Sequence, residues 1–224
     1  MAIFDDELAR LKDRILRMGS MVEDSVKLSV QALVERDNAL AIRVIDNDHA
    51  LNALDVEIDE ECIRLIALMQ PKGADLRLIT MAMKITTDLE RMGDLSVNIA
   101  ERALELNEEQ LLKPYIDVPR MSQVAQGMTR DALNAFVQKD RQLARDVIQR
   151  DDEVDELKHL VLHELAAYMI NDPSTITRAM KISFVAQYLE RIADHATNIA
   201  EMVLYLIDGK IIRHMAPPEI EKEQ

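Results

Sequence analysis

The stretch "DLERMGDLSVNIAE" at residues 88–101 returns as "YLERIADHATNIAE" at residues 188–201. Eight of the thirteen residues at 89–101 are identical to their counterparts 100 positions later. In both copies, apolar residues recur every three or four positions, which is the spacing of one face of an α-helix. The chain therefore carries the same acidic, amphipathic helix twice, and this indicates an internal duplication.

The duplication extends over most of the chain. With an offset of 103 residues, Asp37 corresponds to Asp140 and Val44 to Val147; after the turns "MQPKGAD" and "NDPST" the offset is 100, so the first half has three more residues there. The polar clusters "ERDN" and "QKDR" interrupt the apolar pattern at matching places and predict tight turns between helices. We expect six helices, at residues 5–36, 39–69, 74–112, 119–138, 141–171 and 174–208.

The predicted fold is all-α, with two tandem homologous antiparallel three-helix bundles. The proline-bearing linker "KPYIDVP" divides them, so that the first bundle takes residues 1–112 and the second, with a short C-terminal tail, takes residues 113–224. The composition agrees with this fold, because 5 Gly, 6 Pro and no Trp in 224 residues leave little for the turns and strands of a sheet.

The charge excludes some kinds of partner. A net charge of −14 argues against nucleic acid, since binding to a phosphate backbone needs a concentrated basic surface. The first residues, "MAIFDDELARLKDR", lack the apolar segment of a signal peptide, and no window approaches the length of a transmembrane helix. We therefore expect a cytoplasmic protein. The single Cys62 stands at an apolar helical position, which predicts a buried thiol.

Acidic residues of the expected third helix lie opposite its apolar seam. Glu90, Asp94, Asn98 and Glu101 fall together there, and a stripe facing solvent is the simplest interpretation. However, carboxylates four residues apart repel each other unless a cation lies between them, and no lysine stands between Glu90 and Asp94. A metal ion is the alternative explanation for this pattern.

The expected second helix carries a matching flank of Asp48, Asn52, Asp55 and Asp59. If this flank turns toward the third helix, oxygen ligands from both helices converge into a site suited to magnesium, manganese or iron. The second half repeats the third-helix set as Glu190, Asp194, Asn198 and Glu201, but its partner helix offers Asp151 and Asp155, with Lys158 and Leu162 where the first half has Asp55 and Asp59.

Histidines add two further candidates. His195, directly after Asp194, is a possible nitrogen ligand, although a packed or exposed imidazole explains it equally well. His159 and His163 have the spacing of metal ligands on a helix, but a surface position is the simpler interpretation.

The motifs "LERMGDLSVNIAE", "LERIADHATNIAE" and "QPKGADLR" resemble those of the PhoU family of phosphate-signalling proteins, over nearly the whole chain. The resemblance implies two related three-helix bundles side by side, and multinuclear metal clusters (iron, zinc, magnesium or manganese) held by acidic pairs on the bundle surface. Carried over to this chain, the pairs are Asp55 with Asp59, Glu90 with Asp94, Asp151 with Asp155, and Glu190 with Asp194; Asp48, Glu101, Glu201 and His195 are further candidates. Ala193 departs from the motif, which has glycine there, as at Gly93.

The same resemblance implies a regulatory role without catalytic residues. Its partners are then the ATPase subunit of the phosphate ABC transporter and a phosphate-responsive sensor histidine kinase, which the protein helps to hold in its off state when phosphate is plentiful. We also expect a homodimer.

Two other classes fit the pattern less well. A ferritin-like di-iron oxidoreductase or metal-storage protein needs paired Glu-x-x-His motifs, and this chain has one, at Glu156 and His159. An amphipathic protein of the membrane surface is favoured by the thirteen Met, but it needs basic polar faces, and this chain is acidic.

Overall fold

The structure, a computed structural model, describes residues 2–209. The predicted C-terminal tail, from residue 210 onward, lies outside the described residues. Within them the chain forms α-helices and one short 3₁₀ turn, η1 (Pro173–Thr175), without strands. The helices are α1 (Ala2–Glu35), α2 (Asn38–Met69), α3 (Ala74–Asn107), α4 (Asp117–Gln138), α5 (Arg141–Asn171) and α6 (Ile176–Asp208). The prediction of an all-α fold with six long helices is confirmed.

The boundaries differ most at the end of α3, which was expected to continue to residue 112 and ends at Asn107. The Arg36 guanidinium, from the turn after α1, donates hydrogen bonds to the backbone oxygens of Asn107 and Glu109. The Asn107 side chain also donates to Asn38 Oδ1 at 2.8 Å. These bonds satisfy polar groups beyond the last turn of α3, so the chain can leave the helix before it reaches the linker.

The two tight turns repeat each other in detail. Arg36 and Lys139 stand at equivalent positions, and both have positive φ angles, 58° and 55°. The following residues, Asp37 and Asp140, cap the N-termini of α2 and α5, where Asp37 accepts bonds from the amides of residues 39 and 40, and Asp140 from the amide of Leu143. In both clusters, "ERDN" and "QKDR", a residue in the left-handed conformation ends one helix and the aspartate after it caps the next.

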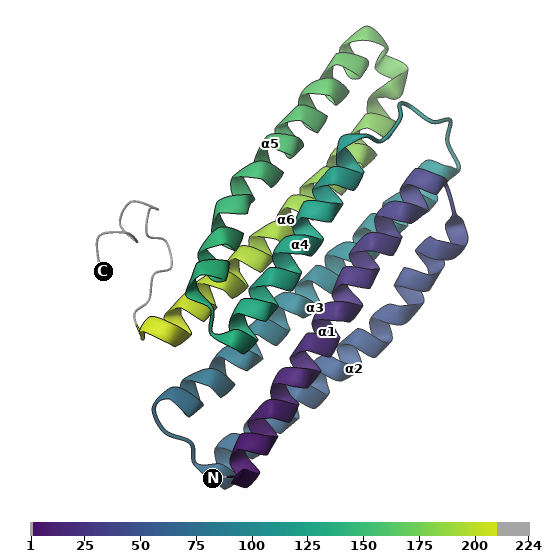
Figure 1. The fold of residues 1–224 in the computed structure, drawn as a ribbon. Helices are drawn as coiled ribbons and strands as arrows, with labels where there is room; N and C mark the ends of the chain where they lie inside the picture. Colours follow the sequence, from purple (N-terminus) through teal and green to yellow (C-terminus); the bar gives the residue numbers. More distant parts are fainter. Residues whose placement is uncertain (1, 210–224) are drawn as a thin grey trace.

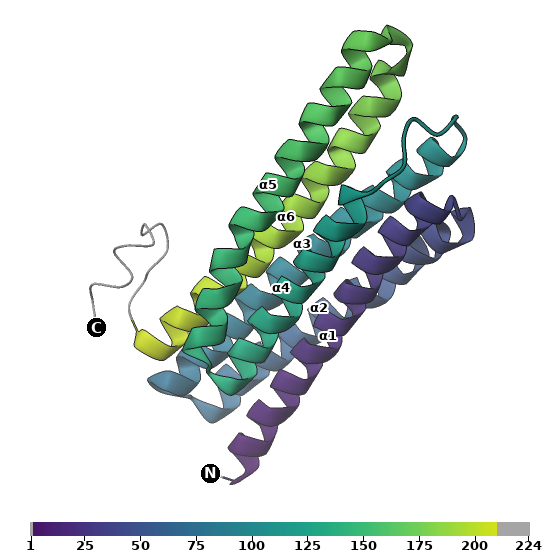
Figure 2. The ribbon, with the colours of Figure 1, turned by 45° about the horizontal axis from the view of Figure 1, so that its top comes forward.

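The two three-helix bundles lie side by side along their lengths (Figure 1). α3 packs against α6, and α1 against α4, so these four helices form the middle of the molecule, while α2 and α5 lie on the outside (Figure 2). Contacts that pair early residues of one helix with late residues of the other, such as Lys12 with Val137 and Glu23 with Arg130, show that α1 and α4 run antiparallel. The buried apolar residues of both bundles form one continuous core.

One close approach holds α1 against α4. Gly19 is buried in α1, and a methyl group on its Cα would overlap Leu133 Cδ1 of α4. Glycine at this position therefore lets the two bundles approach more closely than any other residue would allow.

The linker between the bundles is also fixed by contacts. Lys113 is 4% exposed and forms an ion pair with Glu164 of α5, and burial raises the pKa of the half-buried Tyr115. The division of the chain at residues 112 and 113 stays a prediction about folding units, because packing is continuous across it. No helix within residues 2–209 has a stretch long and apolar enough to cross a bilayer.

Candidate functional site

Acidic side chains of α2 and α3 lie near one another where the two helices pack. We call Asp48, Asp55, Glu90 and Asp94 the first acid group. Asp48 and Asp55 lie on the flank of α2 beside α3, whose residues Glu90 and Asp94 lie one turn apart. The four are close enough that charges of one helix raise the pKa of carboxyl groups on the other.

The pKa shifts show how poorly these charges are compensated. Partial burial, then the charges of Asp94, Asp55 and Asp48, raise the pKa of Glu90, and only Arg91 works against them. Burial and Asp94 raise the pKa of Asp48, which a hydrogen bond from Asn52 at 2.8 Å partly offsets. The group therefore gains a proton more readily than isolated carboxylates, and a cation in the same place would relieve the same repulsion.

The acids of α3 are less exposed than a stripe facing solvent would be. The side chain of Glu90 is 26% exposed and that of Asp94 is 43% exposed. Arg91 of the same helix approaches both, at 3.6 Å from Glu90 Oε2 and 3.5 Å from Asp94 Oδ2. α2 covers one side of these two residues and the other side stays in contact with solvent, so the solvent-facing stripe and the metal site both stay predictions.

Two other candidates of the first half lie at its margin. Asp59 is partly buried on α2, where its charge raises the pKa of Asp55. Glu101 is exposed and forms an ion pair with Arg102 at 3.9 Å. The expected buried thiol is confirmed: Cys62 is fully buried, and burial with the charges of Asp59 and Glu61 raises the pKa of its thiol to about 12.

The second half has an equivalent set, the second acid group, made of Asp151, Asp155, Glu190 and Asp194. Burial, then the charges of Asp194 and Asp155, raise the pKa of Asp151 to about 6. Burial, Glu190 and Asp155 likewise raise the pKa of Asp194. This group differs from the first in containing a base, because Lys158 Nζ lies 2.8 Å from both Asp155 Oδ1 and Glu190 Oε1.

His195 lies between the bundles. Its Nδ1 is 2.7 Å from Asp88 Oδ1 of α3, and both side chains are largely covered, at 25% and 15% exposed. The imidazole thus hydrogen-bonds to the first half of the chain, while its neighbour Asp194 belongs to the second acid group. Glu201 lies further along α6 and is partly buried.

A surface pocket of about 460 Å³ lies where α3 and α6 meet. Every side chain that lines it has its duplicate on the opposite wall, so the pseudo-two-fold axis of the molecule passes through the pocket. Each acid group contributes one residue to the pocket wall, Asp94 from the first group and Asp194 from the second. The lining pairs are Arg91 and Arg191, Asp94 and Asp194, Leu95 and His195, and Asn98 and Asn198.

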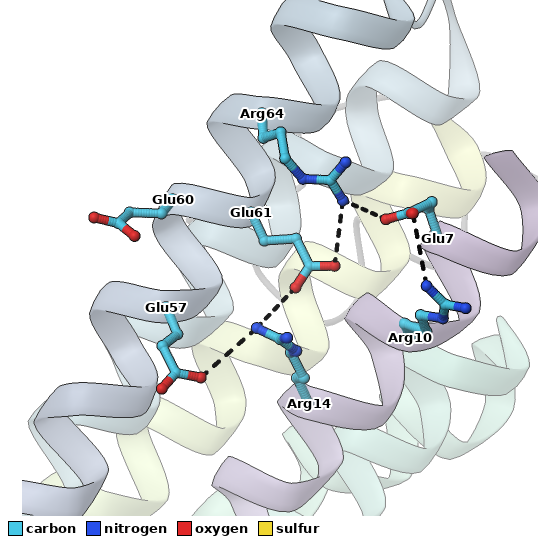
Figure 3. A pocket seen from close by; sticks show the side chains of 7 residues that line it. All are labelled: Glu7, Arg10, Arg14, Glu57, Glu60, Glu61 and Arg64. Atoms are coloured by element: carbon cyan, nitrogen blue, oxygen red, sulfur yellow. Dashed lines mark hydrogen bonds and ion pairs between the residues drawn. The ribbon is translucent and has the colours of Figure 1, made fainter. Parts of the chain in front are cut away.

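A second charged surface, between α1 and α2, is satisfied within itself (Figure 3). Glu61 is only 9% exposed and lies 3.0 Å from Arg14, which also approaches Glu57 at 3.7 Å. Arg64 links Glu61 to Glu7 of α1, and Glu60 points away from the others. These ion pairs fasten α2 to α1 and leave the flank of α2 with the first acid group free to face α3.

The donor set of the first acid group suits a hard cation, since it consists of carboxylate oxygens with a neighbouring amide. Among residues 2–209, however, no three His, Cys, Asp or Glu side chains are placed so that they could hold one metal ion together. The residues of the ferritin-like motif, Glu156 and His159, are exposed on α5, whereas a di-iron centre needs them directed into the core. His163 is exposed too, as its surface interpretation predicted.

A glycine sets how closely α2 approaches α3 beside the first acid group. Gly93 is buried, and a methyl group on its Cα would overlap Leu51 Cδ2 of α2, with Asp48 Oδ1 at 3.6 Å. In the second half the equivalent positions carry Ala193 and Val154, both buried. The larger residue at 193 is thus matched by a smaller one on the partner helix, which explains how the chain departs from the glycine of the motif without losing the packing.

Sequence reasoning missed two features of the site. Asp88 was part of the opening stretch, but Tyr188 replaces it in the second copy, so the duplication did not mark it as functional. Lys158 was treated only as the loss of an acid. Its spacing of three residues from Asp155 was a signal for an ion pair on the helix.

The geometry defines a class of protein: a duplicated helical bundle with an acid group in each half and a pocket on the axis between them. The PhoU domain family matches residues 15–103 and again residues 118–203. This chain belongs to the PhoU family.

Relatives cover nearly its whole length. A phosphate-specific transport system accessory protein PhoU homolog from Aquifex aeolicus is 46% identical over 208 residues, which are 93% of this chain and 94% of that protein. The crystal structure of PhoU from Pseudomonas aeruginosa superposes with a TM-score of 0.88 at 41% identity, over 92% of this chain and 100% of the other. The phosphate transport system regulatory protein PhoU from Streptococcus pneumoniae gives a TM-score of 0.86 at 32% identity, over 93% and 98%.

Substituting Gly93 tests the packing that holds the first acid group. We expect Gly93→Ala to lower the free energy of unfolding by up to about 2 kcal/mol, because overpacking against Leu51 costs about 1–3 kcal/mol and the better helix propensity of alanine returns about 1 kcal/mol. The double variant Gly93→Ala/Leu51→Val recreates the pair found in the second half. Its free energy of unfolding should fall by less than the sum of the decreases in the two single variants. Urea unfolding of all variants measures this coupling.

The control is Gly127→Ala in α4, where the nearest atom to the new methyl group is Arg150 Nη1 at an ordinary 3.6 Å. That change should stabilise the protein by up to about 1 kcal/mol. Additive effects of Gly93→Ala and Leu51→Val would show that the two residues do not compete for the same space.

The raised pKa of Asp151 makes stability depend on pH. An unfolded aspartate titrates near pH ~3.9, so the folded state holds this proton more tightly, and the stabilisation that is complete below that pH is lost as the pH rises through about 6. In the presence of a chelator, Asp151→Asn should therefore melt higher than the parent protein at pH 7.5 and lose this advantage by pH 5. Asp13→Asn, on the exposed side of α1, is the control. An equal difference at both pH values would contradict the assignment.

Proposed function

We propose that this chain is an accessory protein of a phosphate-specific transport system, and that it regulates phosphate uptake and phosphate-starvation signalling through contact with other proteins. The observation that carries the proposal is membership of the PhoU family in both halves of the chain. Support comes from relatives that bear the name of accessory proteins of this system and match 93% to 98% of the chain.

The partners are the ATPase subunit of the phosphate ABC transporter and a phosphate-responsive sensor histidine kinase. The protein works in the cytoplasm, where both partners present soluble domains, and it helps to hold the kinase off when phosphate is plentiful. If binding of the ATPase subunit changes the affinity for the kinase by some factor, binding of the kinase changes the affinity for the ATPase subunit by the same factor, because coupling between two binding sites is reciprocal. No catalytic step is needed for such a role.

Exposed apolar side chains on the outer helices support a role in contacts. Val56 and Ile63 on α2 are 55% and 58% exposed, and Leu160 on α5 is 58% exposed. Such residues become buried at the centre of a protein interface, where they contribute more than the charged rim. These apolar residues are not duplicated, since Val56, Ile63 and Leu160 correspond to His159, Ala166 and Glu57, so the two outer faces differ. The faces serve either two partners or a homodimer.

A divalent cation at the first acid group is the second part of the proposal. As placed, no three of these side chains share one ion, so Asp48, Asp55, Glu90 and Asp94 would turn toward one another to hold it, with Asp59 beside them. A bound cation supplies positive charge between α2 and α3, where the carboxylates otherwise repel each other. Its role is to stiffen the contact between these helices, and thereby the face that the first half offers to a partner.

Deleting the gene tests the regulatory role. We expect the deletion strain to express its alkaline phosphatase in phosphate-rich medium, because the kinase is no longer held off, and a plasmid copy should restore repression. Affinity purification of the full-length protein from phosphate-rich cells should recover both the transporter ATPase and the kinase. Normal repression in the deletion strain, with neither partner recovered, would overturn the assignment.

Removing the carboxylates tests the cation site. Adding manganese to protein treated with a chelator should raise the melting temperature by about 5–10 °C at a concentration about 100 times the Kd. Glu90→Gln/Asp94→Asn should abolish this response and, in chelator, leave stability unchanged or slightly higher, because a repulsion is removed. The control Asp13→Asn/Asp24→Asn removes the same charge from the exposed face of α1 and should keep the response. A parent protein insensitive to manganese, magnesium, iron and zinc would refute this part.

A further inference from the structure

The outer helices differ at three positions of the acid groups and their margin, where Asn52, Asp55 and Asp59 of α2 correspond to Asp155, Lys158 and Leu162 of α5. Asp55 of α2 lies in the first acid group, and the equivalent residue of α5 is Lys158. This substitution reverses the charge, whereas each of the other two differences exchanges a carboxylate for a neutral residue.

Lys158 joins the two helices of the second half. Its Nζ donates hydrogen bonds to Asp155 Oδ1 on α5 and to Glu190 Oε1 on α6, each at 2.8 Å. The lysine side chain is only 18% exposed and Glu190 is 22% exposed, so their ion pair is largely shielded from water. An ammonium held between a carboxylate of its own helix and one of the next is placed as a bridging cation would be.

The surrounding charges agree with this position. Burial works against the charged ammonium, yet the hydrogen bonds to Asp155 and Glu190 and their charges raise the pKa of Lys158 above its usual value. Lys158 in turn opposes the upward shift of the Asp194 pKa.

Among residues 2–209, no lysine or arginine bridges α2 and α3 at the first acid group. The basic side chain that touches its acid group is Arg91, which is 61% exposed and belongs to α3, the helix that also carries its partners Glu90 and Asp94. Since Arg91 and both of its partners belong to α3, it does not link α3 to α2. Asp48 and Asp55 thus face the acids of α3 without a cation between the helices.

We propose that Lys158 is the built-in cation of the second acid group, and that it makes the contact between α5 and α6 independent of divalent metal. The metal response is then confined to the first half. The comparison between the halves rests on the cation site proposed for the first half. The role of Lys158 does not, because it follows from the contacts of Lys158 with Asp155 and Glu190.

The test uses the full chain with the first acid group disabled by Glu90→Gln/Asp94→Asn, so that only the second half can respond to metal. With Lys158 intact, the melting temperature of this protein should not change on adding manganese to chelated samples. Adding Lys158→Met should lower the melting temperature in chelator and create a manganese-dependent rise of about 5–10 °C. Lys158→Arg keeps a cation and should remain insensitive.

A matched control is Lys181→Met. Lys181 is 21% exposed and also bridges two helices, from α6 to Glu105 and Glu109 at 3.2 and 2.8 Å near the end of α3. Its loss should lower the melting temperature without any rescue by manganese, because Lys181 lies outside both the first and the second acid group. If Lys158→Met prevents folding, as far-ultraviolet circular dichroism would show, Lys158→Gln takes its place.

Two results would overturn the inference. One is a manganese response of the disabled protein with Lys158 intact, which would mean that the lysine does not occupy the cation position. The other is a Lys158→Met or Lys158→Gln protein that folds and remains insensitive to manganese. Both results are separate from a failure of the proposed site in the first half, because the disabled protein lacks that site.

Discussion

The packing of α3 against α6 is the constraint on which the rest of the structure depends. Each of these helices contacts three others: α3 packs on α1, α2 and α6, and α6 packs on α4, α5 and α3. A helix buried on so many sides must hide most of its surface, so Glu90 and Glu190 are only 26% and 22% exposed, whereas Glu101 further along α3 is exposed. Burying the apolar seams therefore forces the acids of each half into the gap beside the outer helix.

This arrangement has an energetic cost that the chain meets differently in its two halves. Taking carboxylates partly out of water and placing them together raises their pKa values, as it does for Glu90 in the first half and for Asp151 and Asp194 in the second. The second half contains a lysine among its acids and the first does not. Lys158 thus links the two helices of the second half through its ion pair with Glu190.

The meeting of α3 and α6 also couples the halves. The hydrogen bond between His195 and Asp88 crosses from one bundle to the other, and the pocket on the pseudo-two-fold axis is lined equally by both. With one continuous core and a linker anchored through Lys113, the bundles do not form separable bodies in their packing. A change in the stiffness of the α2–α3 contact therefore acts on a helix that belongs to the common centre of the molecule.

The sequence by itself determined the secondary structure, the duplication and the rows of acids, because each depends on residues a few positions apart. The caps at Asp37 and Asp140, the 3.6-residue period of the seams and the repeated motif are local signals, and they placed most helix ends within two residues. Only the tertiary structure decided how the acids are used. Whether the flank with Asp55 turns toward α3 depends on the rotation of α2, which the fit of Leu51 over Gly93 and the ion pairs with α1 fix. The contacts of Lys158 with Glu190, and of His195 with Asp88, join residues 32 and 107 positions apart. No periodicity along the chain encodes such pairs, since they exist only where two helices are brought side by side by burial of their apolar faces.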